Sequence, residues 1–292
     1  MSGFQTSFTL SFSGGMADDH QLDFYDAAQA MLGFQRSLAL TTHLILNNEV
    51  ITQAPSLKGA RILMQPVQPG SLTVTAVILG GLYTAYKLGT APKDTVVGHL
   101  VHSAYDYVVS EVLGFHVDFD STLGKQIKQH NAVIDSNRLD SLIEKCEPAL
   151  KDVHRPLVIS ESADKAVISS TSFAKPKAIT SQFTHHSYEH IHYTRDRPKQ
   201  ERFEGSISGY NVNTYKGRMY VKKLNRPVPF ELQGTARTPA HIGRLVDSLQ
   251  KNAKNRRDYD ANIQVTAWVA ESRTGRIKKL FLTDVSTAAK GS

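Results

Sequence analysis

The sequence predicts an α+β protein in which an N-terminal α+β domain precedes a small C-terminal β-barrel, SH3-like or OB-like, with one helix. Three observations support this. The length of 292 residues exceeds that of most single domains. Strand-like and helix-like hydrophobic periods alternate in the first half of the chain. Five short strand-like segments and one helical segment follow near the C-terminus. We expect an α+β domain at 1–155, a connecting segment with short strands at 156–200 and a barrel at 201–286.

The N-terminal elements follow from hydrophobic spacing. FQTSFTLSF places Phe4, Phe8, Leu10 and Phe12 on one side of a strand at period two. The next apolar residues recur at helical spacing, and Asp23 or Asp26 is a suitable N-cap. The expected elements are strands at 4–12, 60–67 and 71–79 and helices at 22–46, 95–113 and about 137–150.

The C-terminal elements are short and closely spaced. Most alternate apolar and polar residues, and one segment, TPAHIGRLVDSLQKNAKN, has helical spacing instead. The expected elements are strands at 203–215, 217–223, 227–233, 262–271 and 276–284 and a helix at about 239–254. Short strands are expected between 156 and 200, and the weak alternation of 183–193 favours a strand there.

Charge is distributed unevenly along the chain. The net charge of +7 combines a net −4 up to Thr194 with a net +11 from Arg195 onward. A basic domain joined to a mildly acidic one is typical of a module that binds a polyanion. The alternative is a solubilising coat of Lys and Arg.

Several classes of protein are disfavoured by the sequence. The one cysteine, Cys146, permits no intrachain disulfide and fits a reducing cytoplasm. Pro and Gly residues interrupt the uncharged stretch between Ile62 and Tyr86, so no membrane contact is expected. The chain has no P-loop, GxGxxG or GxSxG motif, and we expect no cofactor.

The basic barrel is the leading candidate site. Cations contact phosphates and aromatic faces stack on bases, and this region contains both. The alternative is that the aromatics fill the barrel core and the cations coat it. The candidate nucleic-acid-binding residues are Arg218, Lys222, Lys223, Arg256, Arg257, Arg276, Lys278 and Lys279.

The segment FTHHSYEHIHYTRDRP is rich in histidine. As a strand it would place His186, His190 and His192 on one face, a weak candidate for a metal site. It lacks the ligand spacing of zinc motifs, so a surface or interface without metal is favoured. A milder functional alternative is a face that becomes cationic as pH falls. Asp118 and Asp120 form a carboxylate pair, but a metal-dependent phosphodiesterase would need further carboxylates.

The segments DFYDAAQAMLGFQRSLAL, QPVQPGSLTVTAVI, RFEGSISGYNVNTYKGRMYV and GRIKKLFLTDV resemble uncharacterised two-domain bacterial and phage proteins of mobile elements. The resemblance implies a bacterial or phage cytoplasmic setting, with roles in mobile-element biology or anti-phage defence. It implies no activity and no site residue.

Together these features favour a non-enzymatic protein that binds DNA or RNA, whose N-terminal domain serves oligomerisation or docking of a protein partner. The first alternative is a scaffold subunit of a larger assembly. The second is a metal-dependent nuclease or phosphodiesterase that uses Asp118, Asp120 and the histidine segment.

Overall fold

The computed structural model describes residues 3–65, 73–81, 95–115, 123–129, 136–171, 177–224, 226–254, 259–271 and 277–287. The chain forms two compact units, Met1–His192 (unit 1) and Tyr193–Ser292 (unit 2). Unit 1 is α+β and unit 2 contains a small β-barrel with a helix, so the predicted fold class is confirmed.

Unit 1 contains an antiparallel sheet of five strands in the order β2-β3-β1-β4-β5. Phe8 and Leu10 are fully buried on one face of β1, as their spacing predicts. Thr9 lies on the other face and shares a hydrogen bond of 2.9 Å with Thr75 of β3. The strands are β1 (Phe4–Ser13), β2 (Ala60–Gln65), β3 (Thr73–Gly80), β4 (Lys165–Ser170) and β5 (Lys177–Ala178).

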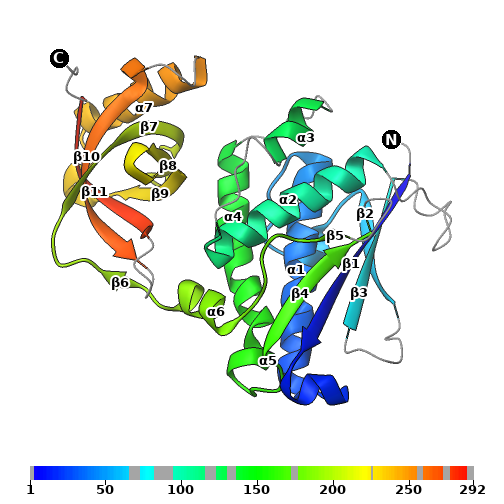
Figure 1. The fold of residues 1–292 in the computed structure, drawn as a ribbon. Coiled ribbons are helices and arrows are strands. Elements are labelled where there is room, and N and C mark those ends of the chain that lie inside the picture. The colour runs from blue at the N-terminus through cyan, green and yellow to red at the C-terminus, as the bar shows by residue number, and fades with distance from the viewer. Residues whose placement is uncertain are drawn as a thin grey trace. The chain divides into compact units, whose positions relative to one another are not determined.

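Helices α1 and α2 pack against this sheet, and α4 packs against both helices (Figure 1). The longest, α1, begins where the Asp23 carboxylate accepts a hydrogen bond from the amide of Asp26 at 3.0 Å. It ends at Asn48, which adopts the left-handed conformation with φ of 50°. The helices are α1 (Phe24–Asn47), α2 (Val96–Leu113), α3 (Leu123–Gln129), α4 (Ser136–Val153), α5 (Arg155–Val158) and α6 (His185–His192), with short 3₁₀ turns η1 (Gly15–Asp19) and η2 (Ala54–Ser56).

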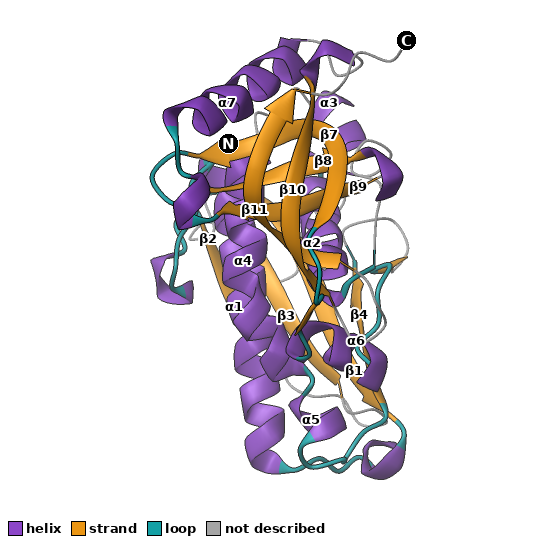
Figure 2. Cartoon of the chain, turned by 90° about the vertical axis from the view of Figure 1, so that its left-hand side faces the viewer, coloured by secondary structure: helices purple, strands orange, loops and turns teal. Residues whose placement is uncertain are grey.

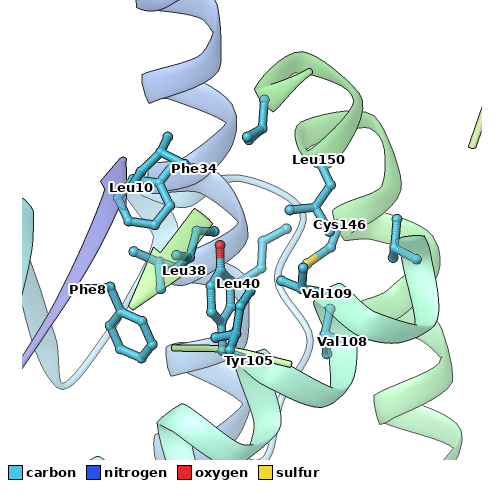
Figure 3. Close-up of a cluster of buried hydrophobic side chains, with 14 of the residues drawn as sticks. Phe8, Leu10, Phe34, Leu38, Leu40, Tyr105, Val108, Val109, Cys146 and Leu150 are labelled. Atoms are coloured by element: carbon cyan, nitrogen blue, oxygen red, sulfur yellow. The ribbon is translucent and has the colours of Figure 1, made fainter. Parts of the chain in front are cut away.

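The core of unit 1 lies between the sheet and these helices (Figure 3). Tyr105 of α2 is fully buried there, and its hydroxyl lies 2.9 Å from Ser37 Oγ of α1. Ser37 Oγ donates to the carbonyl of Phe34, so the tyrosine hydroxyl donates to Ser37. A polar contact therefore fixes the register of α1 against α2 inside an apolar core.

Two buried histidines are neutral parts of the same unit. His154 Nδ1 donates to the carbonyl of Leu150 at 2.9 Å, and Nε2 lies 2.9 Å from the Ser187 hydroxyl oxygen. His102 Nδ1 lies 2.6 Å from Ser170 Oγ. Burial lowers the pKa of each ring from 6.5 to about 4.

Unit 2 is a five-stranded barrel, closed because β11 pairs in parallel with β9 and antiparallel with β10. The circular order is β7-β8-β9-β11-β10, and the helix lies between β9 and β10 in sequence. Of the two barrels expected, this topology is the OB-like one. The strands are β7 (Glu201–Asn211), β8 (Lys216–Val221), β9 (Arg226–Leu232), β10 (Asn262–Glu271) and β11 (Ile277–Thr287), and β6 (Arg195–Asp196) adds to β10.

Helix α7 (Pro239–Lys254) lies across one end of the barrel (Figure 2). Its Ser248 hydroxyl is buried, accepts a hydrogen bond from the amide of Ile207 at 3.0 Å and donates to the carbonyl of Ala261. The remaining turns of unit 2 are η4 (Lys222–Leu224), η5 (Gly234–Ala236) and η6 (Tyr259–Ala261).

Two expectations differ from the structure. The prediction of a strand at 183–193 is wrong, because His185–His192 forms helix α6. The described part of the expected connecting segment up to His192 belongs to unit 1, because β4 joins the first sheet and α5 and α6 lie in that unit. Within the described residues, no helix combines the length and apolar character that a membrane crossing requires.

Gly33 of α1 and Gly243 of α7 make a matched pair for testing helix packing. A Cβ at position 33 would lie 2.1 Å from the carbonyl oxygen of Ala149 in α4, whereas a Cβ at position 243 would meet no atom within 4 Å. Gly33→Ala should lower the free energy of unfolding by about 1–3 kcal/mol. Gly243→Ala should raise it by up to about 1 kcal/mol, because alanine favours the helix. Urea unfolding followed by circular dichroism measures both, and equal effects would contradict this account of α1 and α4.

The buried histidines predict acid sensitivity. Their folded pKa of about 4 lies below the ordinary 6.5, so the unfolded chain binds more protons between these pH values. The free energy of unfolding should fall as pH drops from 6.5 to 4. One pKa unit corresponds to about 1.4 kcal/mol, so over this pH range each histidine lowers the free energy of unfolding by on the order of 3 kcal/mol.

The histidine variants should change the slope of stability against pH. His154→Gln should reduce the slope between pH 6.5 and 4, because one proton is no longer taken up on unfolding. His186→Gln, at an exposed position of the same helix, is the control and should leave the slope nearly unchanged. The slope is measured by urea unfolding at a series of pH values, and an unchanged slope in His154→Gln would contradict the prediction.

Candidate functional site

The predicted cations that the structure describes do not form one set. Arg256, Arg257 and Arg276 lie outside the described residues. Arg218 of β8 is 6% exposed, so the structure does not place it on the surface that a phosphate backbone would contact.

Three further predicted cations occur in different surroundings. Lys222 forms an ion pair with Glu204 of β7. Lys223 is exposed in η4. Lys278 donates to Thr194 Oγ1 at 3.0 Å. Two of these three lysines, Lys222 and Lys278, therefore interact with other side chains of unit 2.

Lys279 belongs to a compact group of charges on the outside of the barrel. Its Nζ lies 2.8 Å from Glu231 Oε2, and Arg237 lies 3.9 Å from Glu231 Oε1. Lys216 is the β8 residue directly opposite Glu231. We call Lys216, Glu231, Arg237 and Lys279 the Glu231 cluster.

The electrostatics of the Glu231 cluster favour an anionic ligand. The hydrogen bond from Lys279 lowers the pKa of Glu231, burial opposes this, and the charges of Lys279, Lys216 and Arg237 lower the pKa further. Glu231 is therefore ionised at neutral pH and balances one of its three cations. The remaining excess of positive charge lies on half-buried and exposed side chains.

Aromatic side chains lie beside the Glu231 cluster. The Arg237 guanidinium lies 4.4 Å from the ring centroid of Tyr215, and Lys279 Nζ lies 5.2 Å from that of Phe281. Trp268 of β10, which pairs with Phe281 of β11, is 40% exposed. Phe230, in contrast, is buried in the barrel core. The aromatics therefore divide between core and surface.

A second group of charges surrounds Glu271 at the C-terminal end of β10. Arg197 Nε donates to Glu271 Oε2 at 2.6 Å, and Arg195 forms an ion pair with the same carboxylate. The hydrogen bond from Arg195 and then that from Arg197 lower the pKa of Glu271. Because Glu271 is only 3% exposed, we interpret this group as structural: it attaches β6 to β10.

A cavity of about 280 Å³ adjoins this structural group. Its lining includes Arg197, Lys223 and Arg226 together with Glu201. Arg197 also pairs with Glu201 at 2.7 Å, and Arg226 donates to the carbonyl of Ile277 at 2.6 Å. Two of the three cations are thus engaged in holding the barrel, which makes this cavity a weaker candidate than the Glu231 cluster.

The histidine segment does not form the three-histidine face expected of a strand. In α6, His186 and His190 lie one turn apart, and His192 stacks on Tyr188 with ring centroids 4.1 Å apart. The buried residues of α6 are Ser187 and Ile191, so the helix is anchored in unit 1 through Ser187 and His154.

Other catalytic or metal-binding candidates gain no support. Asp118 and Asp120 lie outside the described residues. In the described part of the chain, no three His, Cys, Asp or Glu side chains gather closely enough to hold a metal ion. Burial raises the pKa of Cys146 to about 12, so its thiol is protonated and inert at neutral pH.

Unit 1 has a surface cavity of about 600 Å³ at the start of α1. Met16, Leu22, Phe24 and Met31 are among its lining residues. Phe24 is 89% exposed and the adjacent Tyr25 is 63% exposed. Two neighbouring aromatic side chains are therefore directed to solvent in the first turn of a helix.

The sequence contained one signal for the Glu231 cluster that charge counting overlooked. Glu231 is acidic, and the candidate residues were selected only among lysines and arginines. Lys216 is the first residue of β8 and Glu231 lies near the end of β9. The antiparallel hairpin therefore makes them cross-strand neighbours. The contribution of Lys279 depends on the parallel β9–β11 pairing, which no local pattern indicates.

Comparison with known proteins gives a family but no activity. No curated protein and no solved structure matches the chain. A model described as a family of unknown function (DUF7947) matches residues 200–286, which contain the barrel. A model described as a domain of unknown function (DUF7946) matches residues 8–190, which is more than half of the chain. The chain therefore belongs to the DUF7946 family.

Proposed function

We propose that this protein binds nucleic acid, DNA or RNA, through the outer surface of its C-terminal barrel and performs no chemistry on it. The observation that carries the proposal is the Glu231 cluster, in which three cations surround one carboxylate beside solvent-facing aromatic rings. Cations supply phosphate contacts and aromatic rings supply stacking surfaces.

The charge of unit 2 supports the same function. The chain from Arg195 onward has a net charge of +11, and positive charge accelerates the encounter with a polyanion. OB-like barrels often bind oligonucleotides, which supports the proposal by analogy of fold alone.

The contact residues in this proposal differ from the sequence candidates. Lys279 remains, and Lys216 and Arg237 join it from the Glu231 cluster. Lys223 and Lys278 extend the positive surface, and Arg256, Arg257 and Arg276 remain predictions from the sequence. Arg218 is set aside because its side chain is buried.

Protein interaction through unit 1 is a second candidate function. Exposed aromatic side chains beside a largely apolar cavity are typical of a surface that a protein partner covers. A second copy of this chain is the simplest such partner, since most oligomers of soluble proteins are homo-oligomers. This function is compatible with nucleic-acid binding by unit 2.

Nucleic-acid binding through the Glu231 cluster predicts how affinity depends on salt and on the charges of the cluster. Affinity for a labelled oligonucleotide should fall linearly on a logarithmic plot as salt rises, because bound phosphates release counterions. The double variant Lys216→Gln/Lys279→Gln should weaken binding at low salt and reduce the slope by roughly 2. Glu231→Gln should strengthen binding, because it removes the negative charge of the cluster. Fluorescence anisotropy measures all three proteins.

A charge-matched control separates this surface from overall charge. Lys165→Gln/Lys58→Gln removes the same charge from exposed positions in unit 1 and should leave affinity and slope near those of the unaltered protein. Absence of binding to both DNA and RNA at low ionic strength would overturn the proposed function. Equal losses in the two double variants would overturn the assignment to the Glu231 cluster.

Self-association through unit 1 predicts a mass above that of one chain in solution. If Phe24 lies at an interface between copies, light scattering after size exclusion should give a mass above that of one chain. Phe24→Ser should then restore the single-chain mass. The fold should survive, because Phe24 is 89% exposed and contributes little to the core. A single-chain mass for the unaltered protein at micromolar concentration would contradict self-association through this surface.

A further inference from the structure

Two aromatic side chains lie directly opposite each other on the outside of the barrel. Trp268 of β10 pairs with Phe281 of β11 in the antiparallel register. Their chain neighbours Val269 and Leu280 are buried in the barrel core. Because side chains alternate across a strand, both aromatic rings point outward. We call Trp268 and Phe281 the stacking pair.

The barrel core does not use the Trp268 ring. The core is formed by the inward residues of the five strands together with residues of α7 and η5, and Trp268 is absent from it. Its ring is 40% exposed, whereas Lys279 Nζ lies over the ring of Phe281. Trp268 therefore offers a large planar surface to a ligand, with Phe281 and the lysine stem beside it.

Cations lie on both sides of the stacking pair. Lys279 is two residues from Phe281 on β11, in contact with Glu231. Arg202 of β7 is exposed and pairs with Thr266, two residues before Trp268 on β10. Diagonal neighbours on one face of a sheet are about 7–8 Å apart. A planar ring is therefore flanked by positive charge along a line that crosses the strands.

We infer that the stacking pair binds an unpaired base of single-stranded nucleic acid, with the phosphates on either side of that base facing Lys279 and Arg202. This inference rests on the proposed function and specifies its ligand. In a duplex both faces of each base are already stacked, so a duplex presents no base face to Trp268. A single strand presents base faces and phosphates together, which is what this surface matches.

The composition of the chain gives a direct measurement of this contact. Trp268 is the one tryptophan in the sequence, so tryptophan emission reports on this position alone. The full-length protein is titrated at low salt with oligothymidine of roughly 12 nucleotides, within the length that one OB-type barrel covers. Oligouridine of the same length serves as the RNA arm, and a duplex of that length as the comparison.

Stacking predicts saturable quenching of Trp268 emission by the single strands, with little quenching by the duplex. Trp268→Leu should weaken binding of the single strand by roughly tenfold or more, measured by anisotropy of the labelled oligonucleotide. Trp268→Tyr should recover part of that loss, because tyrosine retains an aromatic face. Phe115→Leu, an exposed aromatic position in unit 1, should leave the affinity unchanged.

The outcomes distinguish this inference from the proposed function. Salt-dependent binding that neither quenches Trp268 nor responds to Trp268→Leu would overturn the stacking inference and leave the proposed function standing. Equal quenching by duplex and single strand would also overturn it. A shift of Trp268 emission with protein concentration alone would assign the stacking pair to contact between copies. Failure of every nucleic acid to bind would overturn both.

Discussion

The pairing of β11 with both β9 and β10 is the constraint on which the outer surface of unit 2 depends. This pairing closes the barrel and sets Glu231, Phe281 and Trp268 side by side on three successive strands. The β9–β11 pair is parallel, so the chain must cross from one strand to the other, and α7 and β10 make that connection. Neither the Glu231 cluster nor the stacking pair would exist in an open sheet of the same strands.

Two carboxylates organise the cations of unit 2, with different consequences. Glu271 is almost fully buried, and its two arginines attach β6 to the barrel. Glu231 is only partly buried, and the cations around it keep part of their surface in solvent. The cost of removing a charge from water makes the first group structural, while the second remains available for exchange with a ligand. The burial of the carboxylate thus distinguishes arginines that stabilise the fold, around Glu271, from cations that can contact a ligand, around Glu231.

Much of the fold could be predicted because its elements have strong local patterns. The helix at 239–254 and the strands of the barrel follow from hydrophobic period alone, and Asp23 caps α1 as its sequence suggests. The histidine segment was misread because its polar residues also alternate at period two. Ser187 and Ile191, four residues apart and both buried, carry the helical period there. A serine does not register as a buried residue in a hydrophobic pattern.

The candidate site could be predicted only in part. Charge asymmetry indicated unit 2, and Lys279 was among the expected residues. The burial of Arg218 and the pairing of Lys222 with Glu204 depend on contacts between strands, which a count of cations does not contain. The pairing of Trp268 with Phe281 also depends on register, because a bulge opposite Thr266 and Ala267 shifts β11 against β10.

Along β10 and β11, residues that form the barrel core alternate with residues that form its outer surface. Inward positions such as Val269 and Leu280 specify the barrel, whereas outward positions such as Trp268 and Lys279 specify what the barrel meets. The two sets point to opposite sides of the sheet, so the side chains that fill the core are not those that face a ligand. The outer face can therefore be rewritten for a different ligand, by selection or by design, while the barrel beneath it stays the same.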